Sequence, residues 1–115
     1  MSTKMKLNDP KLFREACYVG GEWVGSGANE TIDVTNPATG EIIGIVPKLG
    51  SSETREAIDA AHSAYPDWRA KTAKERSVIL RGWFDLMLEH QEDLAKLMTA
   101  EQGKPLKESM GEIIY

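Results

Sequence analysis

Three side chains of this 115-residue sequence have the chemistry of a nucleophile or a metal ligand: Cys17, His62 and His90. A reactive cysteine needs an electropositive neighbour that lowers the pKa of its thiol, and neither histidine is near Cys17 in sequence. The two histidines are far apart and lack the further ligands that a zinc site requires around them. We therefore interpret Cys17 as a packed side chain and the histidines as surface or helix-capping residues, and the sequence predicts no catalytic residue.

A glycine-rich segment, residues 25–30, carries the first two glycines of a dinucleotide-binding fingerprint. In that fingerprint a third glycine lies at the start of the helix whose N-terminus binds the pyrophosphate. Here Glu30 takes the third position, and strand-forming residues follow where the helix should begin. We interpret the segment as a turn, and we expect no cofactor-binding residue in this chain.

The composition indicates a globular protein without a basic surface. The chain has 14 basic and 18 acidic residues, and its lysines and arginines are scattered, so we expect no nucleic-acid partner. Lys4 and Lys6 are followed by no apolar stretch, so the N-terminus predicts neither a signal peptide nor a membrane span. A single cysteine excludes an internal disulfide and fits a reducing compartment, and we expect the cytoplasm.

The first half of the chain has the pattern of short antiparallel strands, over about residues 17–47. Asp9 followed by Pro10 predicts a short helix that extends to about Glu15. Gly20 and Gly21 then separate two short strands and tolerate the positive φ of a hairpin turn. Two β-branched runs, residues 31–35 and 41–46, flank a turn at residues 36–40 that contains proline and glycine. Together these segments predict a small antiparallel sheet.

The second half, residues 51–115, has helical periodicity. Ser51 or Ser52 is predicted to cap a first helix that ends at Pro66. Its inward face is rich in alanine, which suggests close packing against another helix. Thr72 and Glu75 have the spacing of a capping box, and the apolar residues after them predict a second helix that forms the core of the chain.

Two further helices are predicted at the end of the chain, with Gly103 closing the first of them and Pro105 opening the second. The last helix ends on Ile113, Ile114 and Tyr115, without a capping residue or a charged tail. We expect these apolar residues to belong to a buried helix that continues in a larger protein.

Four segments, taken in order, resemble the start of the NAD(P)-dependent aldehyde dehydrogenase superfamily. They are residues 21–23 (Gly-Glu-Trp), 36–41 (Asn-Pro-Ala-Thr-Gly-Glu), 57–68 and 101–105 (Glu-Gln-Gly-Lys-Pro). Within the superfamily the sequence is most similar to the succinate-semialdehyde dehydrogenase branch, through segments such as residues 7–9, 32–38, 72–76, 89–91 and 97–99. The resemblance extends over residues 6–115.

The resemblance implies an α/β fold, in which residues 1–115 are the leading, truncated part of the cofactor-binding domain. It also implies an oxidoreductase that converts an aldehyde, here succinate semialdehyde, to the acid with NAD or NADP, and that forms a homo-oligomer when full length. The nucleophilic cysteine and the glutamate base of the family lie in motifs that this chain lacks, and Cys17 matches neither. We therefore expect this chain to be scaffold, to bind no cofactor by itself and to be inactive alone.

One possible site is implied by the resemblance. Some family members bind a structural monovalent cation at positions that correspond here to Val34, Thr35 and Glu101. Carbonyl and carboxylate oxygens suit a hard cation. The family often has aspartate at the last position, so an exposed helix-end carboxylate is favoured over a cation ligand as the interpretation of the longer Glu101.

A second class of function stays open at this stage. The chain could be a standalone, non-catalytic helical interaction module, in which the last helix docks into a groove of a partner. Sequencing the reading frame beyond Tyr115 separates the two hypotheses, because further family sequence supports the dehydrogenase and a stop codon supports the module.

Overall fold

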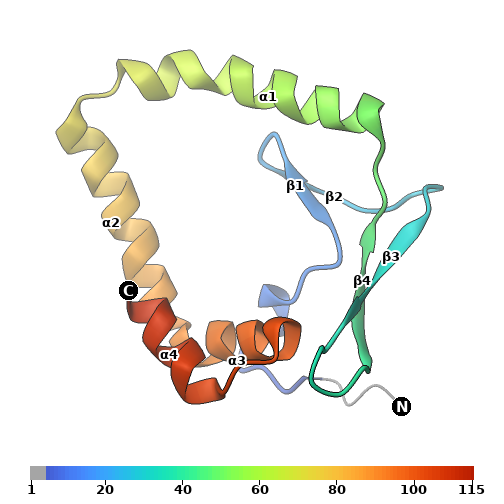
Figure 1. Ribbon diagram of the computed structural model, residues 1–115. Coiled ribbons are helices and arrows are strands. Elements are labelled where there is room, and N and C mark those ends of the chain that lie inside the picture. Colours follow the sequence, from blue (N-terminus) through green and yellow to red (C-terminus); the bar gives the residue numbers. More distant parts are fainter. Residues whose placement is uncertain (1–4) are drawn as a thin grey trace.

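The computed structural model describes residues 5–115, which form two short antiparallel strand pairs followed by four α-helices (Figure 1). This arrangement confirms the α/β class that the sequence predicts. Lys4, one of the two lysines considered above as part of a targeting signal, lies outside the described residues. In chain order the elements are the 3-10 helix η1 (Pro10–Leu12), β1 (Cys17–Val19), β2 (Glu22–Val24), β3 (Thr31–Thr35), β4 (Ile42–Pro47), α1 (Ser51–Ala70), α2 (Ala73–Glu89), α3 (Gln91–Gln102) and α4 (Leu106–Ile114).

The first hairpin joins β1 to β2, with Tyr18 opposite Trp23. Its turn consists of Gly20 and Gly21, whose φ angles of 60° and 83° lie in the left-handed region that strains any residue with a side chain. The aromatic rings of Tyr18 and Trp23 lie on one face, with their centroids 5.0 Å apart. The hairpin that the two glycines predict is therefore confirmed.

The second hairpin joins β3 to β4, with a register irregularity between Val34 and Thr35. The side chain of Asn36 stabilises the turn at residues 36–40, since its Oδ1 accepts a hydrogen bond from the N–H of Ala38 at 2.9 Å. The hairpins form separate two-stranded sheets, whereas the sequence predicted a single small sheet. Periodicity identifies strands but carries no information on which strand pairs with which.

Helix α1 differs from the sequence prediction at both ends. Gly50 is its N-cap, and the N–H of Gly50 donates to the carboxylate of Glu53 at 3.0 Å, so Ser51 and Ser52 are helical residues and not caps. Pro66 lies inside the helix, which continues to Ala70. Proline fixes φ near the helical value and removes one N–H donor. Because Pro66 is exposed and close to the helix end, water can solvate the carbonyl that loses its donor.

The alanine-rich face of α1 packs beside the first hairpin. The sequence analysis had predicted that this face packs against another helix. A Cβ atom built on Gly20 would lie 3.6 Å from the Cβ of Ala60, so the hairpin turn approaches the helix with room for no more than a methyl group between them. Tyr18 and Gly21 of the hairpin line a shallow hollow together with α1. Small side chains on α1 thus admit the turn of a hairpin as readily as another helix.

Helices α2, α3 and α4 begin and end largely where the sequence places them. The capping box of α2 is confirmed: Thr72 Oγ1 accepts from the N–H of Glu75 at 3.2 Å, and Glu75 Oε2 accepts from the N–H of Thr72 at 2.6 Å. These hydrogen bonds hold the pKa of Glu75 below its ordinary value. Gly103 closes α3 with a φ of 83°. Pro105 directly precedes α4.

The hydrophobic core of the described chain is small and lies where α3 packs on α4. Its buried apolar residues are Ala95 and Ile113, and Ser109 is buried on the same pair of helices. Helix α2, which the sequence assigned to the core, contains no buried residue, and the ring of Trp83 is 64% exposed. The apolar face of α2 is real, but within the described residues nothing covers it.

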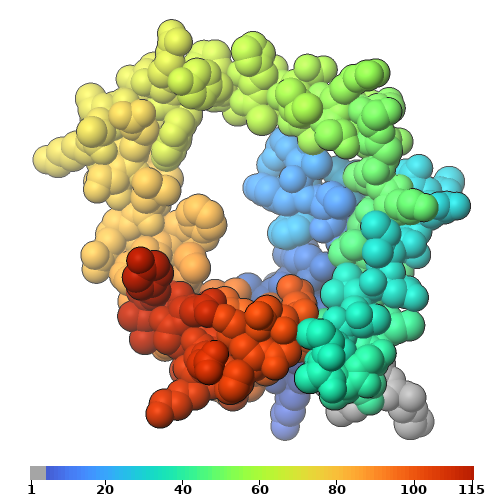
Figure 2. Space-filling view, in the orientation of Figure 1, coloured from blue at the N-terminus to red at the C-terminus, as the bar shows by residue number. Residues whose placement is uncertain are grey.

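The chain is much more open than a compact protein of its length. The Cα radius of gyration is 16.7 Å, whereas a compact chain of this length has a value of about 13 Å. Figure 2 shows an opening through the molecule, framed by α1, α2, the α3–α4 pair and the strands. The exposed surface is 8909 Å², against roughly 6,200 Å² for a compact monomer of this size. The helices therefore present apolar faces that their own chain leaves uncovered.

Candidate functional site

The three side chains with nucleophile or ligand chemistry lie in different elements. Cys17 is half-buried in β1, and His62 is exposed on α1. His90 lies between α2 and α3, where it is the C-cap of one helix and the N-cap of the other, as the sequence interpretation had it. Over residues 5–115 no group of three His, Cys, Asp or Glu side chains could hold a metal ion.

The residues of the predicted cation site come from two parts of the chain that the fold brings together. Val34 and Thr35 are at the irregular end of β3, and Glu101 is in the last turn of α3. A Cβ atom built on Gly103 would lie 2.9 Å from Cγ of Pro37, so the turn that follows β3 packs directly on the end of α3. This contact is compatible with the site, whose occupation stays a prediction.

The α3–α4 corner is held by polar contacts that the sequence did not reveal. The hydroxyl groups of Thr99 and the buried Ser109 are 2.8 Å apart and share a hydrogen bond. Gln91 Nε2 donates to the carbonyl oxygen of Met110 at 2.9 Å. These contacts satisfy buried polar groups between two helices, and none of them supplies a nucleophile with a base.

Asp93 is the most deeply buried charged side chain of the described residues, with 2% of its surface exposed. Its Oδ1 and Oδ2 accept hydrogen bonds from the N–H groups of Asn8 and Asp9, each at 2.8 Å. The N–H groups of Asp9 and Asn8 hold the pKa of Asp93 below its ordinary value, and the opposing effect of burial does not outweigh them. Asp93 thus ties the start of the chain to the first turn of α3.

Sequence reasoning did not identify Asp93 as a buried residue. The available signal was its position, because Asp93 shares a helix face with Leu97, four residues later, on the apolar side of α3. A carboxylate on an apolar face predicts a buried partner. The sequence does not identify that partner, since the two amides are 84 and 85 positions away.

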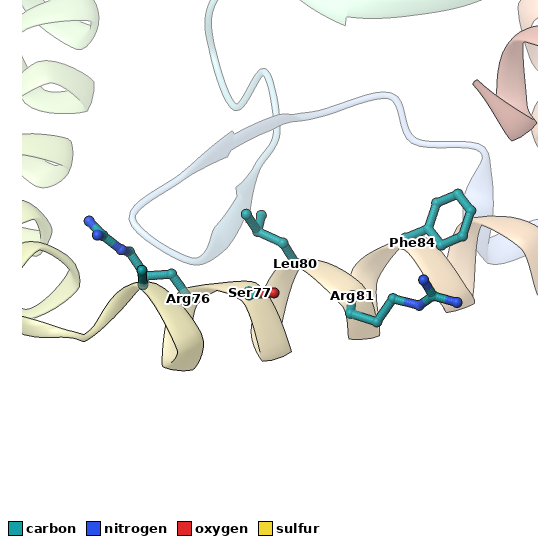
Figure 3. Close-up of a pocket in the computed structure, with 6 residues that line it drawn as sticks. Arg76, Ser77, Leu80, Arg81 and Phe84 are labelled. Carbon is teal, nitrogen blue, oxygen red and sulfur yellow. The ribbon is translucent and has the colours of Figure 1, made fainter.

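An open hollow of about 650 Å³ lies along α2 (Figure 3). Leu80, Phe84 and Arg81 line it, with Ala73, Arg76 and Ser77. Arg81 is already engaged, since its Nε lies 3.2 Å from Asp85 Oδ1 and its guanidinium lies over the ring of Phe84. All six lining residues come from one helix, so the hollow has no second wall among the described residues. Its residues offer a packing surface and no catalytic pair.

The only strand-to-helix connection in residues 5–115 leads from β4 to α1, and it is the natural place to test for a nucleotide phosphate. At its helix N-terminus the N–H of Gly50 is already bonded to the carboxylate of Glu53. Lys48, the nearby cation, pairs with Glu30 at 3.0 Å. The loop at residues 25–30 leads into β3 and not into a helix. These residues do not fit a dinucleotide.

Comparison with known proteins gives a consistent result. Residues 23–115 match the model of the aldehyde dehydrogenase family. The chain is 63% identical over 111 residues to an NADP(+) succinate-semialdehyde dehydrogenase of Escherichia coli K12, covering 96% of this chain and 23% of that protein. It is 62% identical over 111 residues to a glutarate-semialdehyde dehydrogenase of Pseudomonas putida KT2440, with the same coverage.

Solved structures also match most of the chain. An NADP-dependent enzyme of E. coli matches with a TM-score of 0.90 and 63% identity, over 96% of this chain and 23% of that one. An NADP-dependent glyceraldehyde-3-phosphate dehydrogenase of Bacillus halodurans, solved with NADP, matches with a TM-score of 0.82 and 35% identity, over 88% of this chain and 21% of that one. The chain thus spans less than a quarter of the length of the curated relatives it matches.

Proposed function

Because this chain belongs to the aldehyde dehydrogenase family, we propose that it is part of an enzyme that oxidises a small aldehyde to its carboxylic acid with NADP or NAD. Succinate semialdehyde is the first substrate to test, and glutarate semialdehyde is the second. The observation that carries this proposal is the identity of 63% and 62% to dehydrogenases of these two aldehydes, over 96% of the chain. A four-carbon and a five-carbon semialdehyde differ by one methylene, which a binding pocket distinguishes weakly.

The chemistry itself belongs to other parts of the enzyme in this proposal. The nicotinamide cofactor would accept a hydride. The Gly50 N–H is already bonded to Glu53, and residues 25–30 lead into a strand, which supports the view that other parts of the enzyme hold the cofactor phosphates. Cys17 has no base beside it in β1, which supports the view that it is not the nucleophile. We therefore assign to this chain a positioning role in the cofactor-binding domain and no catalytic step.

The uncovered faces of α1 and α2 support this positioning role. Ile58 and Tyr65 on α1, and Leu80, Trp83 and Leu86 on α2, are all at least half exposed. Large contiguous apolar patches are rare on monomeric proteins and mark contact surfaces. We propose that the remainder of the enzyme packs on these faces, and that the complete enzyme is a homo-oligomer.

We further propose that Val34, Thr35 and Glu101 contribute oxygen ligands to a structural monovalent cation. The packing of Pro37 on Gly103, which brings β3 and α3 together, supports this site. Two of its ligands would be backbone carbonyls, which suit such a hard cation.

The compartment that we propose is the cytoplasm, where a lone cysteine stays reduced. No helix within residues 5–115 has the length and apolar character needed to cross a membrane.

The test is a steady-state assay of the protein expressed from its complete reading frame, called here the complete gene product. NADP and NAD reduction is followed at 340 nm with succinate semialdehyde, glutarate semialdehyde and a cationic aldehyde as control. The proposal expects the largest kcat/KM with one of the two anionic semialdehydes. The proposal would be contradicted if none of the aldehydes supported cofactor reduction, or if the cationic control gave the largest kcat/KM.

A further inference from the structure

The N-terminal segment, residues 5–16, contacts two separate parts of the fold. One is the α3–α4 pair, and the other is the β3–β4 hairpin, which is seen beside the segment (blue) in Figure 1. The segment makes a specific polar contact with each of them. Both contacts have the same chemistry, in which a carboxylate accepts a hydrogen bond from backbone N–H groups.

At the first contact the carboxylate belongs to α3. Both oxygens of Asp93 are used by the N–H groups of Asn8 and Asp9, and the side chain is buried. Hydrogen bonds to a charged acceptor are stronger than neutral ones, and a buried carboxylate without them would be costly. The carboxylate of Asp9 in turn accepts from the N–H of Lys11 at 3.0 Å and so begins η1. The start of the segment is therefore fixed on α3.

At the second contact the carboxylate belongs to the segment. Oε1 of Glu15 accepts from the N–H of Ile45 at 2.9 Å, on the outer edge of β4. The ring of Phe13 lies against the same strand, because a Cβ atom built on Gly44 would lie only 2.7 Å from its Cζ atom. Only glycine allows the ring to approach the strand this closely. The end of the segment is therefore fixed on β4, where it occupies the N–H of Ile45.

We propose that residues 8–15 are a strap that sets the position of the β3–β4 hairpin relative to α3, with Asp93 and Glu15 as its two positioning residues. The hairpin is also held at its turn, where Pro37 lies against Gly103, and at its other end, where the chain continues from β4 through residues 48–50 into α1. The strap adds a contact along β4, between these two ends. Opening the strap thus lets the edge of β4 move away from α3 and leaves the α3–α4 pair intact. The inference does not depend on the reaction that the enzyme catalyses.

Hydrogen–deuterium exchange of the complete gene product tests the strap. Exchange is read by mass spectrometry in peptides that cover residues 5–16, 31–47 and 106–114. In Asp93→Asn one of the two acceptor oxygens becomes an NH2 group that faces an N–H. Exchange in residues 5–16 is expected to rise roughly tenfold or more, since a hydrogen bond to a charged group is lost. Exchange in residues 31–47 should rise with it, and exchange in residues 106–114 should stay within twofold of the parent protein.

Two matched pairs keep the test decisive. Asp85→Asn removes an exposed carboxylate that pairs with Arg81 on α2, and it should change none of the three peptides. Glu15→Ala removes the acceptor at the hairpin end and should expose residues 31–47, whereas Glu15→Gln keeps an oxygen for Ile45 and should restore most of the protection. Glu15 is an exposed residue outside the helices and strands, so its variants provide the test even if Asp93→Asn does not fold.

A local rise in exchange in the strap and the hairpin, with the Glu15→Gln rescue, would support the proposal. An equal rise in all three peptides would show that Asp93 only stabilises the whole fold. Protection of the hairpin that is unchanged in both Asp93→Asn and Glu15→Ala would show that the strap does not position it. Either of these two results overturns the inference.

Discussion

Replacing Gly103 with alanine should destabilise the complete gene product by about 2 to 5 kcal/mol, because two separate costs meet at this residue. The first is conformational, since Gly103 has a φ of 83° and an L-residue in the left-handed region loses about 1 to 2 kcal/mol. The second is steric, since the new Cβ would lie 2.9 Å from Cγ of Pro37, and overpacking costs about 1 to 3 kcal/mol. Pro37 is a rigid ring, so it cannot move aside cheaply.

Gly40 provides the matched control for this change. It has a similar φ of 77°, but a Cβ atom there would meet nothing within 4 Å. Gly40→Ala should therefore cost only the conformational part, about 1 to 2 kcal/mol. The difference between the two variants measures the contact that brings the end of β3 to the end of α3.

The assay is urea unfolding of both variants and the parent protein, with the slope of the free energy against urea checked for constancy. The account predicts a larger loss for Gly103→Ala than for Gly40→Ala, by about 1 to 3 kcal/mol. Equal losses would refute the packing of Pro37 on Gly103. No loss in either variant would refute the left-handed conformation of both glycines.

Three further predictions concern the uncovered face, the buried carboxylate and the cation. Trp83→Ala should cost about 3 to 5 kcal/mol by urea unfolding of the complete gene product, where we propose that other parts of the enzyme cover the ring. A normal stability with an altered KM would instead make this face a binding surface. The hydrogen bonds of Asp93 lower the pKa of its carboxyl group in the folded state. The resulting stabilisation is fully present above the unfolded carboxyl pKa of about 3.9. It is lost as the pH falls through the lower folded-state pKa. The stability difference between the parent and Asp93→Asn, measured against pH, should therefore shrink as the pH falls below the unfolded value. The charges of Lys96 and His90 also lower the pKa of this carboxyl. A difference that grows below the unfolded value would contradict the prediction. Replacing potassium and sodium with tetramethylammonium should lower the melting temperature of the parent but not of Glu101→Gln, and an equal shift in both would leave Glu101 out of the cation site.

Local chemistry made parts of this fold predictable. Gly20 and Gly21 specify a hairpin turn, Thr72 and Glu75 specify a helix start, and Gly103 specifies a helix end, because each signal and its effect lie within a few residues. All of these are confirmed by the structure.

The features that sequence reasoning missed depend on distant partners or on competition between neighbours. Asp93 accepts its hydrogen bonds from residues at the other end of the chain, and no pattern near it names them. Gly50 is the N-cap of α1 although Ser51 is the better capping residue, since the carboxylate of Glu53 satisfies the Gly50 N–H. Pro66 is tolerated inside α1 because its side of the helix is exposed. The sequence assigned α2 to the core, but α2 is exposed within the described residues. An apolar face indicates a contact surface without identifying the segment that packs on it.

The central claim is that this chain positions the chemistry of an aldehyde dehydrogenase without supplying any of it. The most direct measurement is NADP reduction with succinate semialdehyde, recorded side by side for the complete gene product and for purified residues 1–115, with near-UV circular dichroism and sedimentation of the latter. The account predicts turnover by the complete gene product, and for residues 1–115 no turnover, self-association and little fixed tertiary structure. Aldehyde-dependent NADP reduction by residues 1–115 alone would contradict the claim, and so would a complete gene product that oxidises no aldehyde.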